Sequence, residues 1–122
     1  MHVHVVAVVS HQVDFAVPAR RVHTAVTAEA HRWLRLEPGE QPLRYFDRPD
    51  LQVVWGSLWP DRPIDQVRLD LEAEDGWTGS RLRWTLTCLE TRRPDRARTA
   101  RLRRRLDEIF AVDLAAHLAR HP

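Results

Sequence analysis

The side chains best placed to do chemistry are Asp113 and His117, four positions apart near the end of the chain. On a helix this spacing puts both side chains on one face. A carboxylate can orient an imidazole and raise its basicity, so His117 would act as a general base with Asp113 as its orienting partner. A solvated pair at a helix end is the alternative, because a histidine there also suits the helix dipole. Asp113 and His117 are therefore our candidate catalytic residues.

Five tryptophans in 122 residues form a second group of candidates. Trp55 and Trp59 share one face if their strand continues past the glycine between them, and Trp84 shares a face with apolar neighbours. Large aromatic side chains on a concave sheet can line an apolar pocket and stack on a flat ligand, or they can fill the core. The candidate ligand-binding residues are Trp55, Trp59, Trp84, Leu106 and Phe110. The candidate polar anchors at the rim are Arg44, Tyr45 and Arg83.

Metal, redox and phosphate chemistry find little support in the sequence. Cys88 is the only cysteine, which excludes an intrachain disulfide and a cysteine-rich zinc site, and its apolar neighbours predict a buried side chain. His2 and His4 share a strand face, but no third ligand accompanies them, so we expect no metal site and no cofactor. The four glycines are too scattered to form a phosphate-binding loop.

Eight arginines fall within 14 residues, where the last helix is expected to begin. Such charges are typical of the solvated face opposite an apolar stripe, but they can also form a surface for an acidic partner. Aromatic residues do not interleave with them, so we do not expect nucleic-acid binding. The eight residues are Arg92, Arg93, Arg96, Arg98, Arg101, Arg103, Arg104 and Arg105.

The length and composition indicate one soluble domain spanning residues 1–122. The net charge is only +2, and the absence of lysine and asparagine is typical of an AT-poor, bacterial coding sequence. No apolar run approaches the roughly 20 residues that cross a bilayer. No basic segment followed by a long apolar stretch opens the chain, so a cytoplasmic location is expected by default.

The first third of the chain predicts a strand followed by short helices. A β-branched, alternating run indicates one long strand over 2–16, with a bulge near Ser10. Pro18 suits the first turn of a helix, because its missing N–H costs nothing there, and predicts a helix over 18–27. A second short helix, or a continuation of the first, covers 28–36 and is closed by a Pro-Gly pair.

The middle of the chain predicts three or four further strands, over 42–47, 51–58, 64–74 and 81–89. In the third of these runs apolar and polar residues alternate, as in an antiparallel strand with one buried face. Its apolar side is formed by Val67, Leu69, Leu71 and Ala73. The opposing apolar side of the fourth run is formed by Leu82, Trp84, Leu86 and Cys88. The turn between these two strands falls at Asp75-Gly76.

The remainder of the chain, from Pro94, predicts one long amphipathic helix. Its apolar residues recur every four positions and form a continuous stripe, which must lie against the sheet because nothing else is available to cover it. The stripe consists of Leu102, Leu106, Phe110, Leu114 and Leu118. We therefore predict an α+β fold in which a curved antiparallel sheet grips a long C-terminal helix, with one or two short helices after the first strand.

This arrangement resembles the START-like, or SRPBCC, helix-grip superfamily. Residues 13–22 (VDFAVPARRV) resemble its opening strand, its Ala-Pro junction and its first helix, and residues 24–34 (TAVTAEAHRWL) resemble the segment that follows. Residues 65–86 are similar to its penultimate hairpin, and residues 106–118 to its closing helix. Members of the superfamily include polyketide cyclases and aromatases and heat-shock ATPase activator-like proteins.

The resemblance implies a small-molecule binding protein with a cavity between the sheet and the last helix. We expect a hydrophobic or aromatic ligand and a role as carrier, sensor or accessory protein, without a demonstrable reaction. A cyclase- or aromatase-like enzyme is the first alternative, and a protein-interaction module that uses the arginine-rich helix face is the second. The sequence is also compatible with a homodimer formed through an exposed strand edge and does not decide the oligomeric state.

Overall fold

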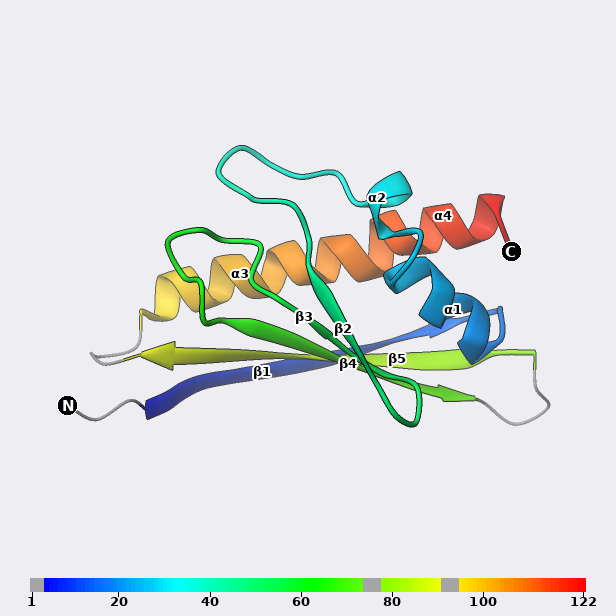
Figure 1. Ribbon diagram of the computed structural model, residues 1–122, viewed down its shortest axis with the longest axis horizontal. Helices are drawn as coiled ribbons and strands as arrows, with labels where there is room; N and C mark the ends of the chain where they lie inside the picture. The colour runs from blue at the N-terminus through cyan, green and yellow to red at the C-terminus, as the bar shows by residue number, and fades with distance from the viewer. Residues whose placement is uncertain (1–3, 74–77, 91–94) are drawn as a thin grey trace.

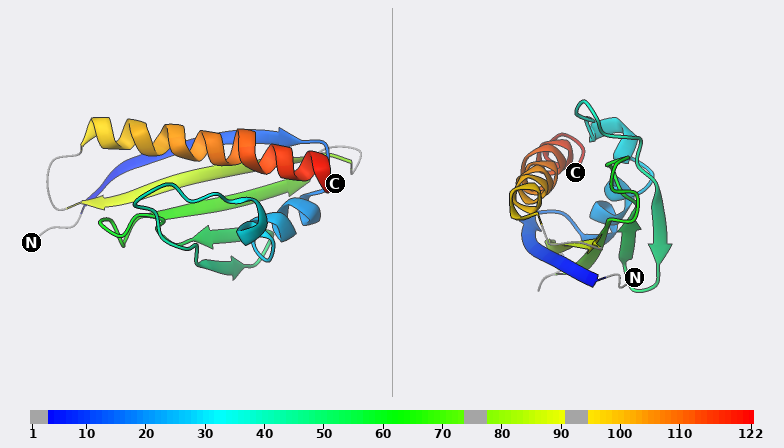
Figure 2. Two further views of the ribbon diagram at one scale, coloured as in Figure 1. Left: turned by 90° about the horizontal axis from the view of Figure 1, so that it is seen from above. Right: turned by 90° about the vertical axis from the view of Figure 1, so that its left-hand side faces the viewer.

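The computed structural model describes residues 4–73, 78–90 and 95–122, with only the backbone for 4–8 and 89–90. Its centre is a five-stranded antiparallel sheet in the order β1-β5-β4-β3-β2, crossed on one face by a long C-terminal helix (Figure 1). Seen end-on, the sheet is curved and the helix lies inside the curve (Figure 2). The predicted α+β fold is therefore confirmed, including the short helices after the first strand.

The strands in chain order are β1 (His4–Phe15), β2 (Tyr45–Arg48), β3 (Gln52–Trp55), β4 (Gln66–Ala73) and β5 (Ser80–Glu90). Strand β5 lies between β1 and β4 and pairs with both, so the first and last of these strands in the chain are neighbours in the sheet. The register of β1 shifts between Val5 and Ala7. The bulge predicted near Ser10 is therefore wrong in position, since Ser10 pairs regularly with Thr85.

Alternate side chains of β4 and β5 face the helix, as the apolar alternation predicts. The buried ones are Val67, Leu69, Leu71, Leu82, Trp84, Leu86 and Cys88. Ala73, which was expected on the same face, is exposed at the end of β4. The predicted Asp75-Gly76 turn lies outside the described residues.

Strand β3 is shorter than its apolar pattern predicts, because it ends at Trp55 and the chain bends at Leu58. The Ser57 hydroxyl accepts a hydrogen bond from the Trp59 backbone N–H at 3.0 Å and lies 3.1 Å from the Trp59 carbonyl, which it can donate to. This local hydrogen bonding competes with strand pairing. Trp55 and Trp59 therefore do not share a strand, so the condition under which they were expected on one strand face is not met.

The C-terminal helix is continuous and consists of α3 (Arg96–Glu108), a π-helical segment η1 (Ile109–Leu114) and α4 (Ala115–Arg120). Asp95 caps its start by accepting a hydrogen bond from the Arg98 backbone N–H at 3.0 Å. The predicted apolar stripe is buried along its whole length, at Leu102, Leu106, Phe110, Leu114 and Leu118.

The π-helical segment explains how a strict spacing of four keeps one face toward the sheet. In an α-helix, residues four apart overshoot a full turn by about 40°, so such a stripe drifts around the helix. The i→i+5 hydrogen bonds of η1 place more residues in one turn and so reverse that drift. Leu114 and Leu118 consequently return to the face that Leu102 and Leu106 occupy.

Two short helices follow β1. α1 (Ala19–Val26) begins directly after Pro18, as expected, and packs on β4 and β5. α2 (Ala30–Trp33) is a single turn and ends earlier than predicted, because the chain becomes extended at Leu34. The Trp33 side chain folds back onto α1, where its Nε1 donates to the Ala25 carbonyl at 2.7 Å.

Candidate functional site

The aromatic side chains expected to surround a ligand pack against one another between the sheet and the last helix. Phe110 lies between two tryptophans, with ring centroids 5.1 Å from Trp55 and 6.4 Å from Trp84. Trp55 Nε1 donates to the Val26 carbonyl at 2.8 Å. Trp84 Nε1 is buried and has no hydrogen-bond partner among the described residues. The cluster combines dense aromatic packing with one unpaired donor.

The five predicted ligand-binding residues are all buried. All five belong to the hydrophobic core, which Trp59 joins from the turn after β3. None of them lines any of the three surface pockets described below. Their role in ligand binding therefore stays a prediction.

The candidate base His117 is buried, but its hydrogen-bond partner differs from the one predicted. Its Nε2 lies 2.9 Å from Glu29 Oε1, and no hydrogen bond to Asp113 is present among the described residues. Arg21 lies 2.9 Å from the same carboxylate oxygen and also donates to the His121 carbonyl at 2.7 Å. The imidazole is thus held by Glu29 from the turn before α2, and Arg21 of α1 binds the same carboxylate oxygen.

Glu29 is an anion stabilised from two sides. Hydrogen bonds from His117 and then Arg21 lower the pKa of Glu29 below its ordinary value. Trp33 stacks on the His117 ring with centroids 6.4 Å apart, which covers the imidazole. This network anchors the end of α4, and a catalytic role for Asp113 and His117 stays a prediction.

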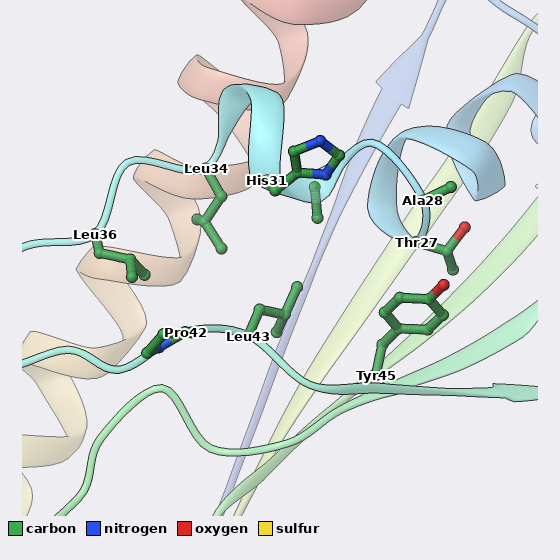
Figure 3. Close-up of a pocket in the computed structure, with 9 residues that line it drawn as sticks. Thr27, Ala28, His31, Leu34, Leu36, Pro42, Leu43 and Tyr45 are labelled. Atoms are coloured by element: carbon green, nitrogen blue, oxygen red, sulfur yellow. The ribbon is translucent and has the colours of Figure 1, made fainter.

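A pocket of about 360 Å³ opens between the end of α1, α2 and the segment that leads into β2 (Figure 3). Its lining is mostly apolar, and two of its side chains are unusually exposed for their type, Leu36 at 41% and Tyr45 at 43%. The residues lining it are Thr27, Ala28, Ala30, His31, Leu34, Leu36, Pro42, Leu43 and Tyr45. Below, this site is called the strap pocket, and residues 34–44 are called the strap.

The strap contains no helix or strand and is positioned by a few polar contacts. Gly39 turns it at a φ of 89°, a left-handed conformation that favours glycine, and Glu40 N–H bonds back to the Glu37 carbonyl. Gln41 N–H then donates to the Leu58 carbonyl at 2.8 Å, which attaches the strap to the turn after β3. These contacts hold Leu36 and Leu43 on the same pocket.

Arg105 fixes the strap to the long helix. Its Nε and Nη2 lie 2.9 and 2.8 Å from the two carboxylate oxygens of Glu40, and Nη2 also donates to the Arg35 carbonyl. The side chains are only 8% and 4% exposed. Burial alone would raise the pKa of Glu40, but the bonds from Arg105 and from the Glu37 backbone outweigh it and lower that pKa.

Arg105 also corrects the prediction for the arginine run. We expected all eight arginines on a solvated face, yet Arg105 is buried because it must reach the strap. Arg98 forms an ion pair with Asp61, in which Nη1 lies 2.9 Å from Oδ2. Arg101, Arg103 and Arg104 are exposed and form no ion pair with another described residue, while Arg92 and Arg93 lie outside the described residues. An acidic partner for this face stays a prediction.

Two further hollows differ from the strap pocket in character. One of about 510 Å³ lies beneath the other side of the strap and is lined largely by polar residues, including Arg44, Gln66 and Asp65. Burial raises the pKa of Asp65 despite the nearby Arg62. A smaller hollow of about 240 Å³ lies between the end of β1 and α4. Neither combines an apolar lining with free polar groups as the strap pocket does.

Within residues 4–73, 78–90 and 95–122, no group of three or more histidine, cysteine or acidic side chains is arranged to hold a metal ion. Over the same ranges no helix is both long and apolar enough to span a membrane. Cys88 is buried, as its apolar neighbours predict.

Sequence reasoning identified only one lining residue of the strap pocket, Tyr45, as a polar anchor at a rim. Leu34, Leu36 and Leu43 were missed because the predicted helix over 28–36 and strand over 42–47 placed them in regular elements, whereas the structure places them in the strap. The available signal was local: two leucines at the end of the predicted helix, just before a proline that forbids it to continue. Exposed leucines at such a place indicate an apolar surface.

Comparisons with known proteins agree on the fold. No protein-family model matches the chain, and no curated protein matches it. A START superfamily protein from Mycobacterium smegmatis superposes with a TM-score of 0.71 at 14% identity, over 94% of this chain and 99% of that one. An uncharacterised protein from Bacillus thuringiensis gives 0.64 at 10% identity, over 91% and 98%. Ara h 8.0201 gives 0.62 at 14% identity, over 97% and 99%.

These similarities extend over nearly the whole of each chain, so they concern the complete fold and not one motif. The chain has the START-like, SRPBCC-like fold that its sequence predicts.

Proposed function

From this START-like fold, we propose that the chain binds a small hydrophobic or aromatic molecule in the strap pocket and acts as a carrier, sensor or accessory protein. The observation that carries the proposal is the pocket itself. Its volume of about 360 Å³ lies within the range of small-molecule sites, and apolar lining with a few polar groups is their usual character. Proteins of this fold type bind hydrophobic ligands, which supports the proposal that this chain binds a small hydrophobic molecule.

The strap pocket is favoured over the aromatic cluster because it has room. Trp55, Trp84 and Phe110 are fully buried and in mutual contact, so a ligand there requires side chains to move. The strap pocket is open, and Leu36 and Tyr45 already expose apolar surface that a ligand would cover. Covering that surface stabilises a complex by about 25 cal/mol for each Å² removed from water.

Two-dimensional NMR with a neutral aromatic probe, 2-naphthol, separates the two sites. Binding in the strap pocket shifts the backbone amide signals of Leu34, Leu36 and Leu43. Binding in the aromatic cluster shifts the indole N–H signals of Trp55 and Trp84 instead. Shifts confined to the indole signals would overturn the strap pocket as the site, and no shifts at all would count against the function.

A matched pair of variants tests the site by affinity. Leu36→Asp places a charge in the apolar lining and should weaken 2-naphthol binding at least tenfold. Ile64→Asp makes the same change at an exposed isoleucine that lines none of the three pockets described, and should leave binding unchanged. Equal affinities of the two variants would contradict the assignment.

A further inference from the structure

The strap pocket has a polar end and an apolar end. In Figure 3 the leucines of the strap gather with Pro42 on one side of the pocket, and the tips of His31, Tyr45 and Thr27 lie on the other. The apolar side consists of Leu34, Leu36, Pro42 and Leu43. A ligand that fills the whole pocket must therefore have one apolar part and one polar part.

The polar end offers hydrogen-bond donors that the described residues do not use. The Tyr45 hydroxyl and the His31 ring both belong to exposed residues, and neither has a hydrogen-bond partner among the described residues. Imidazole carries at least one N–H in either protonation state, and a phenol carries one O–H. The Thr27 hydroxyl is already 2.7 Å from the His23 carbonyl, which leaves its oxygen as an acceptor only.

The charge around the pocket selects the sign of the polar part. No aspartate or glutamate is among the nine described residues that line it. Glu37 and Glu40 are the acidic residues of the strap, and both pair with Arg105: it occupies both carboxylate oxygens of Glu40, and its Nη1 lies 3.8 Å from Glu37 Oε1. An ammonium or guanidinium head would find no counter-charge at the polar end, whereas an anionic head would accept hydrogen bonds from two donors.

We propose that the ligand of the strap pocket is an amphiphilic acid, whose apolar chain or ring lies on the leucine side and whose carboxylate accepts hydrogen bonds from Tyr45 and His31. The proposal rests on the binding function proposed above and adds the chemical class of the ligand. Tyr45 and His31 would determine which head group the pocket prefers. The leucines would contribute apolar contact that does not depend on the head group.

The test compares three probes that share one apolar tail: decanoate, 1-decanol and decylamine, each titrated calorimetrically below its micelle-forming concentration. We expect decanoate to bind about tenfold more tightly than decylamine, since Tyr45 and His31 can donate to a carboxylate, whereas no acidic side chain lines the pocket to pair with an ammonium. The double variant Tyr45→Phe, His31→Leu should remove that preference and leave 1-decanol within about twofold. Both residues are exposed, so the variant is expected to fold, which circular dichroism checks.

The outcomes separate the two proposals. Equal binding of all three probes, abolished by Leu36→Asp, would overturn the acid preference while supporting the binding function. Tighter binding of decylamine, or a decanoate preference unchanged in the double variant, would also overturn it. If none of the probes binds the unmodified protein and 2-naphthol does not bind either, the binding function fails and the ligand class fails with it.

Discussion

At the scale of single residues, the pair formed by Arg105 and Glu40 shows how a charge can be essential where the sequence suggests a solvated face. Arg105 belongs to a run of arginines, and nothing in that run distinguishes it from Arg104. Only the structure shows that Arg105 is buried and reaches the strap, while Arg104 beside it is exposed. Removing one partner of such a buried pair leaves an uncompensated charge.

Arg105→Met should lower the free energy of unfolding by about 3 kcal/mol, because Glu40 is then buried without its partner. Arg104→Met is the matched control: it changes the neighbouring, exposed arginine and should cost less than about 0.5 kcal/mol. Urea denaturation of the two variants measures both values. Equal stabilities would contradict the role assigned to the pair.

The same pair predicts how stability depends on pH. The pKa of Glu40 is lowered from its ordinary value of 4.5, so its contribution is present above pH 4.5 and is lost as the pH falls through the lowered pKa. Glu40→Gln should therefore be less stable than the unmodified protein at pH 7, and the difference should shrink below pH 4.5. Thermal denaturation at pH 7, 5 and 3.5 checks this, and a constant difference would refute it.

The indole N–H of Trp55 donates a hydrogen bond and that of Trp84 has no partner among the described residues, so their substitutions by Phe should differ in cost. Trp55→Phe leaves the Val26 carbonyl without its donor, whereas Trp84→Phe removes a donor that has no acceptor among the described residues. Both changes also leave a cavity. Trp55→Phe should cost about 1–3 kcal/mol more than Trp84→Phe in urea denaturation. The reverse order would indicate that the Trp84 N–H is bonded in solution.

Residue roles were predicted well where they follow from periodicity and poorly where they depend on distant partners. The burial of Leu82, Trp84 and Leu86 follows from alternation alone. The partner of His117 does not, because Glu29 lies 88 positions earlier in the chain and meets the imidazole only when α1 docks on α4. The spacing of four predicted Asp113 as the partner of His117, because a spacing identifies only neighbours on the same helix.

At the scale of elements, the C-terminal helix matches its prediction in extent and apolar face, but its π-helical segment was not foreseen. The evidence for it was present in the sequence: an apolar residue every four positions does not fit a straight α-helix. The turn in η1 adds one residue and realigns the stripe. The strap pocket, by contrast, is formed largely by a segment without helix or strand, so no pattern of helix or strand residues predicted it.

This account of η1 predicts which single deletion the helix tolerates. Deleting Ala111, an exposed residue within η1, should convert the π-helical turn into an α-helical one and keep Leu114 and Leu118 facing the sheet. Deleting Ala116, an exposed residue of α4, should turn His117 and Leu118 away from their partners and cost about 2–5 kcal/mol, as does losing a buried leucine. Urea denaturation of both variants ranks them, and a greater loss for the Ala111 deletion would contradict the account.

At the scale of the whole molecule, order is expected to be unequal between the sheet and the strap. β5 is paired on both sides, with β1 and β4, and its inward side chains are fully buried. The strap is held by Arg105, by Gln41 and by its own turn. Local opening is easiest where buried apolar contacts and backbone hydrogen bonds are few.

Amide hydrogen exchange followed by mass spectrometry should therefore show the slowest exchange in peptides from β4 and β5 and fast exchange in the strap. A ligand in the strap pocket should slow exchange in residues 34–44 and leave β5 unchanged. Protection that spreads mainly to β5 and η1 instead would place the ligand in the aromatic cluster. A strap as protected as β5 without ligand would contradict the uneven order described here.

The long helix follows all five strands of the sheet in the chain, which has a consequence for biosynthesis. Every strand of the sheet is made before α3, yet the buried stripe of α3, η1 and α4 supplies one wall of the core. Contacts such as Glu40 with Arg105 and Glu29 with His117 join segments 65 and 88 residues apart. During synthesis on the ribosome the apolar face of the sheet stays uncovered until the helix emerges, so the nascent chain is a natural client for chaperones that shield hydrophobic surface.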